Sequence, residues 1–292
     1  MDRRSDKEKI RKDYWLNDLN YKILNWNSNH NCVVFISSAG LDLSIKDFYE
    51  WNTISQRKEV QRHFGKCIFI RDPLSSFYVD GINHEIDCID KLIDYIKAQT
   101  SGYNVIIAGY SAGAYLALIL ASCMNNVTRV LAFSAVASLY EWSGEHGDES
   151  VEKNQHLFSH IKEERYSKYY NIQNMIKNID CRTLYFYPSN SPLDVVQEKI
   201  IIGGNNNIIA IGFLSNKHSV TVNHINHVRL LCSKDEHIDK IKKKYNFARN
   251  VKSSAFTFFN LGIFFYFKEQ FLRVNRALKR FINRHFKRFV RT

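Results

Sequence analysis

The chain has 292 residues and a formal charge of +12. This length suffices for one large domain with a full core, and the chain shows none of the repeats that would indicate a solenoid or fibrous protein. The six cysteines are scattered, with no C-x-x-C pair, which argues against a disulfide framework or a zinc site and favours a reducing compartment.

The positive charge is concentrated at the two ends of the chain. Residues 249–292 hold eleven Lys or Arg and one acid, and residues 1–13 hold six bases and four acids. The body between them is neutral, so the charge does not predict a nucleic-acid-binding protein. Residues 1–13 have no apolar stretch. We therefore expect no signal peptide and no membrane anchor there. We expect a cytoplasmic protein.

Short apolar runs predict the strands of a mainly parallel sheet. The runs lie at 32–38, 67–71, 104–108, 129–134, 182–187 and 207–213. Between the second and third runs, apolar residues at helical spacing predict a helix over 84–99. Strands that alternate with helical segments indicate right-handed crossovers and an α/β sheet flanked by helices.

A nucleophilic serine is indicated by the pentapeptide Gly109-Tyr110-Ser111-Ala112-Gly113. The predicted strand Asn104–Ala108 precedes it, and Ala114–Ala121, rich in helix formers, follows it. A strand that turns sharply into a helix exposes a serine in a strained conformation, and the turn is so tight that only glycine fits on either side. The alternative is that Ser111 is an ordinary helix N-cap.

Serine acyl chemistry also needs two backbone amides that stabilise an oxyanion. One is expected from Ala112, directly after the nucleophile. The other is expected from Ala39 or Gly40, small residues in the turn after the first buried strand. Ala39 and Gly40 could instead form a tight turn without this role.

Some forty polar residues separate the strands predicted at 129–134 and 182–187. This segment, about 139–180, is too long for a plain connection and is partly helical in character. We interpret it as a cap over the active site. The alternative is a solvated excursion without a catalytic role.

The remaining members of a catalytic triad are predicted at the ends of the last two strands. Asp194 lies in a turn-rich loop after the strand at 182–187, and two of the chain's three prolines make this loop rigid. Asp194 could also serve only as a turn or cap residue. His218 follows the last strand on a polar loop and is the preferred base. His224 and His227 compete with it, although both fall in a predicted helix over 222–231.

The tail differs in character from the rest of the chain. From 264 to 290, apolar residues at helical spacing alternate with Arg and Lys, which predicts a basic amphipathic helix. Contact with the anionic inner face of a membrane fits this pattern. Two alternatives remain open: packing of the aromatic face on the core or in an oligomer, and binding of a polyanionic polysaccharide.

Taken together, the elbow, the order Ser, Asp, His and the strand pattern resemble the α/β-hydrolase fold over roughly residues 30–240. We divide the chain into a charged N-terminal segment with the first strand region (1–30), a catalytic domain (31–247) and a basic helical tail (248–292). No group of histidines or cysteines has metal-ligand spacing, so no metal is expected.

Four short segments resemble proteins of bacterial capsule and surface-polysaccharide loci, among them capsule O-acetyltransferases. They are Arg71-Asp72-Pro73, Phe77–Gly81, Gly109–Tyr115 and Ala132–Ala135. This resemblance implies that the serine takes an acetyl group from acetyl-CoA, with no bound cofactor, and passes it to a sugar hydroxyl of a polysaccharide or oligosaccharide.

The same resemblance implies two substrate contacts. Asp72 and Tyr78 are expected near the sugar site, although Asp72 could simply cap a turn, and Tyr110 beside the nucleophile is a third candidate. An esterase or deacylase with the same triad, and a silent scaffold of a polysaccharide-export assembly, are the alternative functions.

Overall fold

The computed structural model describes residues 12–17, 20–38, 49–144, 166–205, 207–218, 224–245 and 248–251. The chain divides into two compact units after Asn250. Every described residue belongs to the first unit except Val251, which ends the last strand. The helix predicted over 264–290 lies outside the described residues.

The described part of the chain contains one eight-stranded sheet in the order β1-β3-β2-β4-β5-β6-β7-β8. Neighbouring strands from β3 to β7 are parallel, whereas β1 is antiparallel to β3. The predicted, mainly parallel α/β sheet is therefore confirmed. The strands are β1 (Tyr21–Asn25), β2 (Asn31–Ile36), β3 (Lys66–Ile70), β4 (Asn104–Tyr110), β5 (Val127–Phe133), β6 (Arg182–Pro188), β7 (Ile209–Phe213) and β8 (Ala248–Val251).

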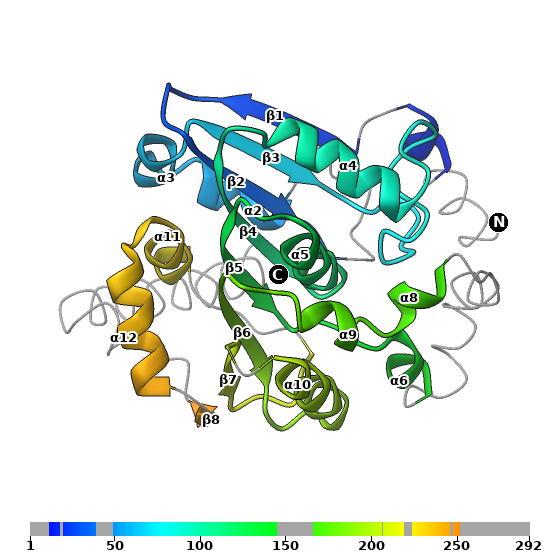
Figure 1. The fold of residues 1–292 in the computed structure, drawn as a ribbon, viewed down its shortest axis with the longest axis vertical. Helices are drawn as coiled ribbons and strands as arrows, with labels where there is room; N and C mark the ends of the chain where they lie inside the picture. The colour runs from blue at the N-terminus through cyan, green and yellow to red at the C-terminus, as the bar shows by residue number, and fades with distance from the viewer. Residues whose placement is uncertain are drawn as a thin grey trace, which may run out of the picture. The chain divides into compact units, whose positions relative to one another are not determined.

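Helices cover both faces of the sheet. Figure 1 shows α4, α5, α9 and α10 along one face and α3, α11 and α12 along the other. On the second face, α11 packs against α2 and α3, and α12 packs against β7. The helices are α2 (Tyr49–Ser55), α3 (Lys58–His63), α4 (Ile89–Gln99), α5 (Ala112–Cys123), α6 (Leu139–Gly144), α8 (Ser167–Tyr170), α9 (Gln173–Ile176), α10 (Pro192–Gly204), α11 (His224–Cys232) and α12 (Asp235–Tyr245).

Helix α5 is the central helix of the first layer. All of its residues from Ala112 to Ala121 are buried, as expected of a helix that is apolar on every side. It packs on β2, β4 and β5 beneath it and on α9 beside it. The β4–α5 junction is consequently held from several directions.

Aromatic rings fill the space under the second helical layer. Phe133 of β5 stacks on Phe186 of β6 with ring centroids 4.9 Å apart. Trp51 of α2 stacks on Phe35 of β2 at the same distance, and its indole N–H donates to the Ile36 carbonyl oxygen. Large rings of this kind bury much apolar area, so this layer is anchored close to the carboxyl ends of the strands.

The helix predicted over 84–99 is shorter in the structure, where α4 begins at Ile89. The side chain of Asn83 accepts hydrogen bonds from the backbone N–H groups of Glu85 and Ile86. These bonds hold the preceding residues in a turn, because an Asn side chain offers the backbone an alternative to helix hydrogen bonds.

The segment interpreted as a cap is described only at its ends. Its first residues form α6 and its last residues form α8 and α9, whereas residues 145–165 lie outside the described residues. Both described ends pack on the body, α6 against α10 and α9 against α5 and α10. The hydroxyl of Tyr115 in α5 donates to the Tyr169 carbonyl oxygen at 2.6 Å.

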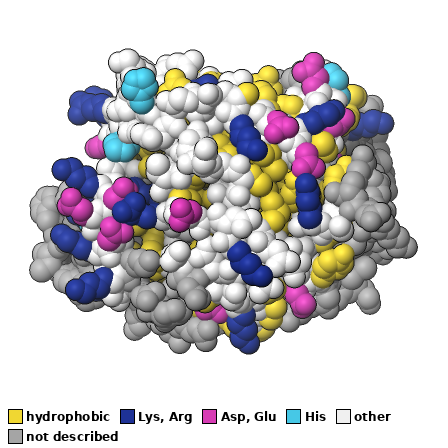
Figure 2. Space-filling view, in the orientation of Figure 1, with side chains coloured by type: hydrophobic (Ala, Val, Ile, Leu, Met, Phe, Trp, Pro, Cys, Tyr) yellow, Lys and Arg dark blue, Asp and Glu magenta, His cyan; other side chains and the backbone are white. Residues whose placement is uncertain are grey.

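Charged side chains of both signs lie on the described surface. Figure 2 shows Lys and Arg side chains interspersed with Asp and Glu across the face it presents. Mixed charges of this kind create no extended field of one sign on that face.

Candidate active site

The candidate nucleophile lies at the turn from β4 into α5. Ser111 has φ 49° and ψ −115°, a strained conformation for a residue with a side chain. Its backbone N–H donates to the Phe133 carbonyl oxygen of β5 at 2.8 Å. The hydroxyl of Ser111 makes no helix-capping hydrogen bond, so its side chain is directed to another partner.

The two flanking glycines make this turn possible. A Cβ atom at Gly109 would stand 2.3 Å from the Gly113 carbonyl oxygen. A Cβ atom at Gly113 would stand 2.4 Å from the Ile36 carbonyl oxygen of β2. Real Cβ atoms do not approach backbone so closely, and therefore any larger residue would move the helix away from the sheet.

The candidate acid lies in the first turn of α10 and not, as predicted, in a loop, because the helix begins directly after Ser191. Asp194 follows the N-cap residue Ser191 by three positions, and Pro192 occupies the first helical position, where its lack of an N–H group costs nothing. Asp194 is completely buried. Its Oδ1 atom lies 2.9 Å from Nδ1 of His218, and its Oδ2 atom accepts a hydrogen bond from Ser191 Oγ at 2.5 Å.

The candidate base connects the two. His218 lies on the loop after β7, and its Nε2 atom is 2.9 Å from Ser111 Oγ. Its side chain is 30% exposed, so the imidazole can meet a substrate while its other nitrogen faces the buried carboxylate. The structure therefore brings Ser111, His218 and Asp194 into one hydrogen-bonded series at the carboxyl edge of the sheet.

The competing histidines differ from His218 in position. His227 is buried, and its Nε2 atom lies 2.6 Å from the hydroxyl of Tyr110. Its ring packs against Trp51 and Phe133. The structure thus places His227 and Tyr110 together in an aromatic cluster under the second helical layer. His224 begins α11, and its side chain lies outside the described residues.

Of the expected oxyanion donors, only Ala112 falls in the described chain. It is the first residue of α5, so its backbone N–H has no partner within the helix. The N-terminal end of a helix also carries a partial positive charge that favours a developing oxyanion. Ala39 and Gly40 lie outside the described residues.

Two candidate substrate contacts are used within the protein. Asp72 is buried, and its carboxylate accepts hydrogen bonds from the backbone N–H groups of Leu74 and Tyr78. Tyr78 is completely buried, and its hydroxyl donates to the Ser37 carbonyl oxygen at 2.6 Å. Both side chains stabilise the turn after β3 and the end of β2.

Ser191 donates a hydrogen bond to the candidate acid and is not among the site residues predicted from the sequence. Two serines, Ser189 and Ser191, lie within five residues of Asp194, and both suit a turn. The order Ser-Pro at the start of a helix is a sequence signal for an N-cap. This signal could have identified Ser191.

No family model matches the sequence, and no curated protein matches it either. Solved structures match in shape. The inhibited esterase B from Lactobacillus rhamnosis is 12% identical, with a TM-score of 0.53 over 82% of this chain and 93% of that chain. The fold is that of the α/β-hydrolases.

Two further α/β-hydrolases resemble the chain less closely. The Pyrococcus furiosus esterase Pf2001 is 13% identical, with a TM-score of 0.47 over 78% of this chain and 94% of that chain. Acetyl xylan esterase 1 from Thermoanaerobacterium is 15% identical, with a TM-score of 0.47 over 73% of this chain and 79% of that chain. At such identities the likeness concerns the fold alone. The resemblance to capsule O-acetyltransferases stays a prediction.

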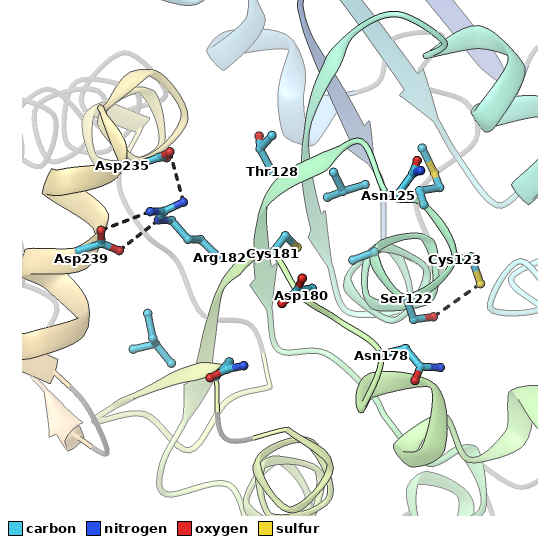
Figure 3. A pocket seen from close by; sticks show the side chains of 15 residues that line it. Ser122, Cys123, Asn125, Thr128, Asn178, Asp180, Cys181, Arg182, Asp235 and Asp239 are labelled. Atoms are coloured by element: carbon cyan, nitrogen blue, oxygen red, sulfur yellow. Dashed lines mark hydrogen bonds and ion pairs between the residues drawn. The ribbon is translucent and has the colours of Figure 1, made fainter.

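A cavity of about 800 Å³ lies at the opposite edge of the α/β-hydrolase sheet. It is bounded by the end of α5 and the first residues of β5, β6 and β7 (Figure 3). Arg182 extends from its wall toward α12, where it pairs with Asp235 and Asp239. Strands of five to seven residues, at about 3.3 Å per residue, separate this cavity from the triad, so it is not part of the candidate active site.

In the described part of the chain, no group of three His, Cys, Asp or Glu residues could hold a metal ion. None of the helices in these ranges combines the length and apolar character needed to cross a membrane.

Proposed function

We propose that this protein is a serine acyltransferase that O-acetylates a bacterial capsular or surface polysaccharide from acetyl-CoA. The observation that carries the proposal is the series Ser111–His218–Asp194, with 2.9 Å at both hydrogen bonds to the imidazole. A serine hydroxyl becomes a useful nucleophile when an adjacent imidazole takes its proton and a carboxylate orients that imidazole.

In the first half-reaction, Ser111 Oγ attacks the thioester carbonyl and its proton passes to His218 Nε2. Collapse of the tetrahedral intermediate breaks the carbon–sulfur bond, and His218 gives the proton to the leaving thiolate. The products are acetyl-Ser111 and CoA thiol. The carboxylate of Asp194 stabilises the imidazolium between the two proton transfers.

In the second half-reaction, a sugar hydroxyl occupies the position that the thiol has left. His218 takes its proton, the sugar oxygen attacks the acetyl carbonyl, and the carbon–oxygen bond to Ser111 breaks. The proton returns to Ser111. The backbone N–H of Ala112 supports the proposal as a donor for the oxyanion in both steps, with the second donor expected from Ala39 or Gly40.

The experiment that tests the proposal is incubation with radiolabelled acetyl-CoA and capsule oligosaccharides. We expect label in the glycan, and a labelled protein when the acceptor is omitted. Ser111→Ala should abolish both, whereas Ser122→Ala, at the far end of α5, should abolish neither. Acetyl transfer that survives Ser111→Ala would reject the proposal.

A carbohydrate esterase is the second candidate, and the specific observation in its favour is the shape similarity to an esterase at a TM-score of 0.53. The acyl-enzyme is common to both functions, and they differ in whether water or a sugar hydroxyl accepts the acyl group. Acetate released from acetylated oligosaccharides, with no transfer from acetyl-CoA, would favour the esterase.

For residues 249–292 we propose contact with an anionic membrane surface on the cytoplasmic side, where a capsule precursor would be met. The basis is the sequence alone, with eleven bases and one acid. Replacement of Arg280, Arg284 and Arg288 by Glu in the full chain should weaken binding to vesicles that contain phosphatidylserine. Unchanged binding would favour an internal packing role for the tail.

A further inference from the structure

The candidate acid is held by two different groups, one on each carboxylate oxygen. His218 Nδ1 lies 2.9 Å from Oδ1 of Asp194, and Ser191 Oγ donates to Oδ2 at 2.5 Å. Asp194 is completely buried and Ser191 is 7% exposed. Because bulk water does not reach this carboxylate, the hydroxyl of Ser191 supplies the hydrogen bond that water would supply to an exposed aspartate.

Ser191 occupies the N-cap position of α10, but helix capping alone does not account for its geometry. An N-cap serine normally accepts a hydrogen bond from a backbone N–H two or three positions later. Here the distance from the Asp194 N–H to Ser191 Oγ is 3.5 Å, against 2.5 Å between Ser191 Oγ and the carboxylate. The shorter and stronger contact of this hydroxyl is with the side chain.

Two bonds on one carboxylate restrict its rotation. With Oδ2 held by Ser191, Oδ1 stays directed at His218, and the imidazole keeps the tautomer whose Nε2 atom accepts the proton of Ser111. The first turn of α10 adds its partial positive charge to the stabilisation of the carboxylate.

The helix that carries this pair is itself fixed to the body. Gln197 is buried in α10, and its Oε1 atom accepts hydrogen bonds from the backbone N–H groups of Ala137 and Ser138 at 2.7 and 2.8 Å. Its amide nitrogen donates to the Ser138 carbonyl oxygen. The loop after β5 therefore holds α10, and α10 presents Ser191 and Asp194 as one unit.

We propose that Ser191 is a positioning residue of the triad, acting on Ser111 through Asp194 and His218. The proposal rests on the proposed function of these three residues. It assigns to Ser191 a part in catalysis that is separate from its part in starting the helix.

The test compares Ser191→Ala with Ser191→Thr and with Ser138→Ala. The side chain of Ser138 is a matched control because it is buried, lies just before α6 and accepts a hydrogen bond from the Glu141 N–H at 3.3 Å. Ser138→Ala removes only this hydroxyl and keeps the backbone hydrogen bonds between Ser138 and Gln197. The readout is the rate of Ser111 phosphonylation by a fluorophosphonate probe, measured by intact mass across pH, with thermal unfolding measured alongside.

Ser191→Ala should slow labelling by about 10- to 100-fold, the effect of losing a hydrogen bond to a charged group. The pH below which labelling is lost should also differ from that of the wild type, because the carboxylate that stabilises the imidazolium form of His218 loses one of its two hydrogen bonds. Ser191→Thr keeps the hydroxyl and should restore both. Ser138→Ala should alter unfolding only.

Other titratable groups near the carboxylate are unchanged in these variants. They are His218, Tyr185 and Tyr187 of β6 and Glu198 of α10. Burial raises the pKa of Tyr185, and electrostatic interactions with Asp194, Tyr187 and Glu198 add to that rise. A change in the pH below which Ser191→Ala loses labelling is thus assigned to the missing hydroxyl.

Ser191→Ala could lose stability as Ser138→Ala does and still keep the wild-type labelling rate and the wild-type pH below which labelling is lost. In that case Ser191 is only a helix cap and the inference is wrong. Failure of the proposed function gives a different result, namely labelling that persists in Ser111→Ala.

Discussion

The hydroxyl of Tyr110 lies 2.6 Å from Nε2 of His227, which commits this imidazole to a buried aromatic cluster. Tyr110 directly precedes Ser111 in the chain, so the histidine that contacts the neighbour of the nucleophile is occupied by that neighbour. His218, with its ring 30% exposed, is the imidazole that faces Ser111 Oγ.

This difference predicts opposite effects for the two histidines. His218→Ala should lower the rate of Ser111 labelling by about 10²- to 10⁴-fold, the usual contribution of a general base, with little change in stability. His227→Phe should leave labelling near the wild-type rate. It should lower the free energy of unfolding by about 1–3 kcal/mol, because the hydroxyl of Tyr110 loses a hydrogen-bond partner. A loss of labelling in His227→Phe alone would assign the base to His227.

The close approach of Gly113 to β2 predicts that this glycine cannot be replaced. A Cβ atom would stand 2.4 Å from the Ile36 carbonyl oxygen, and Gly113→Ala should destabilise the protein by about 1–3 kcal/mol through overpacking. It should also slow Ser111 labelling, since α5 must shift. Urea denaturation and the probe assay measure the two effects.

Gly203 is the matched control for this substitution. It lies in α10, where an added Cβ atom would stand 3.5 Å from its nearest neighbour. Gly203→Ala should therefore stabilise the protein by about 0.5–1 kcal/mol through helix propensity. Equal stability of the two variants would mean that the β4–α5 turn is looser than its geometry indicates.

Two arginines that pair with the same carboxylate should differ in their contribution to stability. The side chain of Arg129 is 4% exposed and donates to the carbonyl oxygens of Leu230 and Ser233 as well as to Asp235. Arg129→Met should lower the free energy of unfolding by about 3 kcal/mol. This value is at the lower end of the range for breaking a buried ion pair, because Asp235 is half exposed.

Arg182 pairs with Asp235 from the surface, where its side chain is 42% exposed. Arg182→Met should therefore lower the free energy of unfolding by no more than about 1 kcal/mol. Denaturant midpoints of the two variants give the comparison, and a larger loss for Arg182 than for Arg129 would contradict it.

Stability should fall as the pH is lowered through the range of histidine titration. Burial, followed by the charge of Arg129, holds the pKa of His63 below its ordinary value of 6.5. Burial and neighbouring cations, Arg229 first, do the same to the pKa of His237. Below about pH 6.5 the unfolded chain binds protons that the folded chain does not, so the free energy of unfolding decreases.

The measurement is the thermal midpoint between about pH 7.5 and 5, for the wild type and for the double variant His63→Gln, His237→Gln. The wild-type midpoint should fall more steeply on acidification than that of the double variant. Parallel curves would show that other groups dominate the pH dependence.

The positions of Ser111, Asp194 and His218 can be inferred from order alone, because each follows a strand and parallel strands bring their carboxyl ends to one edge. The strands themselves follow from continuous apolar runs. The short antiparallel β1 is less evident, since its burial is only partial.

Side-chain partners are harder to infer than positions. A carboxylate such as Asp72 has the same sequence context whether it faces a substrate or accepts hydrogen bonds from Leu74 and Tyr78 within its own turn. Likewise, the Ser-Pro order marks Ser191 as an N-cap but does not show that its hydroxyl donates to Asp194, whereas that of Ser189 donates to the Phe213 carbonyl oxygen. Such choices depend on where neighbouring strands place their backbone.

From the two hydrogen bonds to the imidazole we infer that Ser111 is a nucleophile activated by His218 and Asp194. The most direct test of this inference is the intact mass of the full chain after reaction with a fluorophosphonate probe, followed by peptide mapping. We expect a single adduct on Ser111 in the wild type and none in Ser111→Ala. An unlabelled wild-type protein, or an adduct that persists in Ser111→Ala, would contradict it.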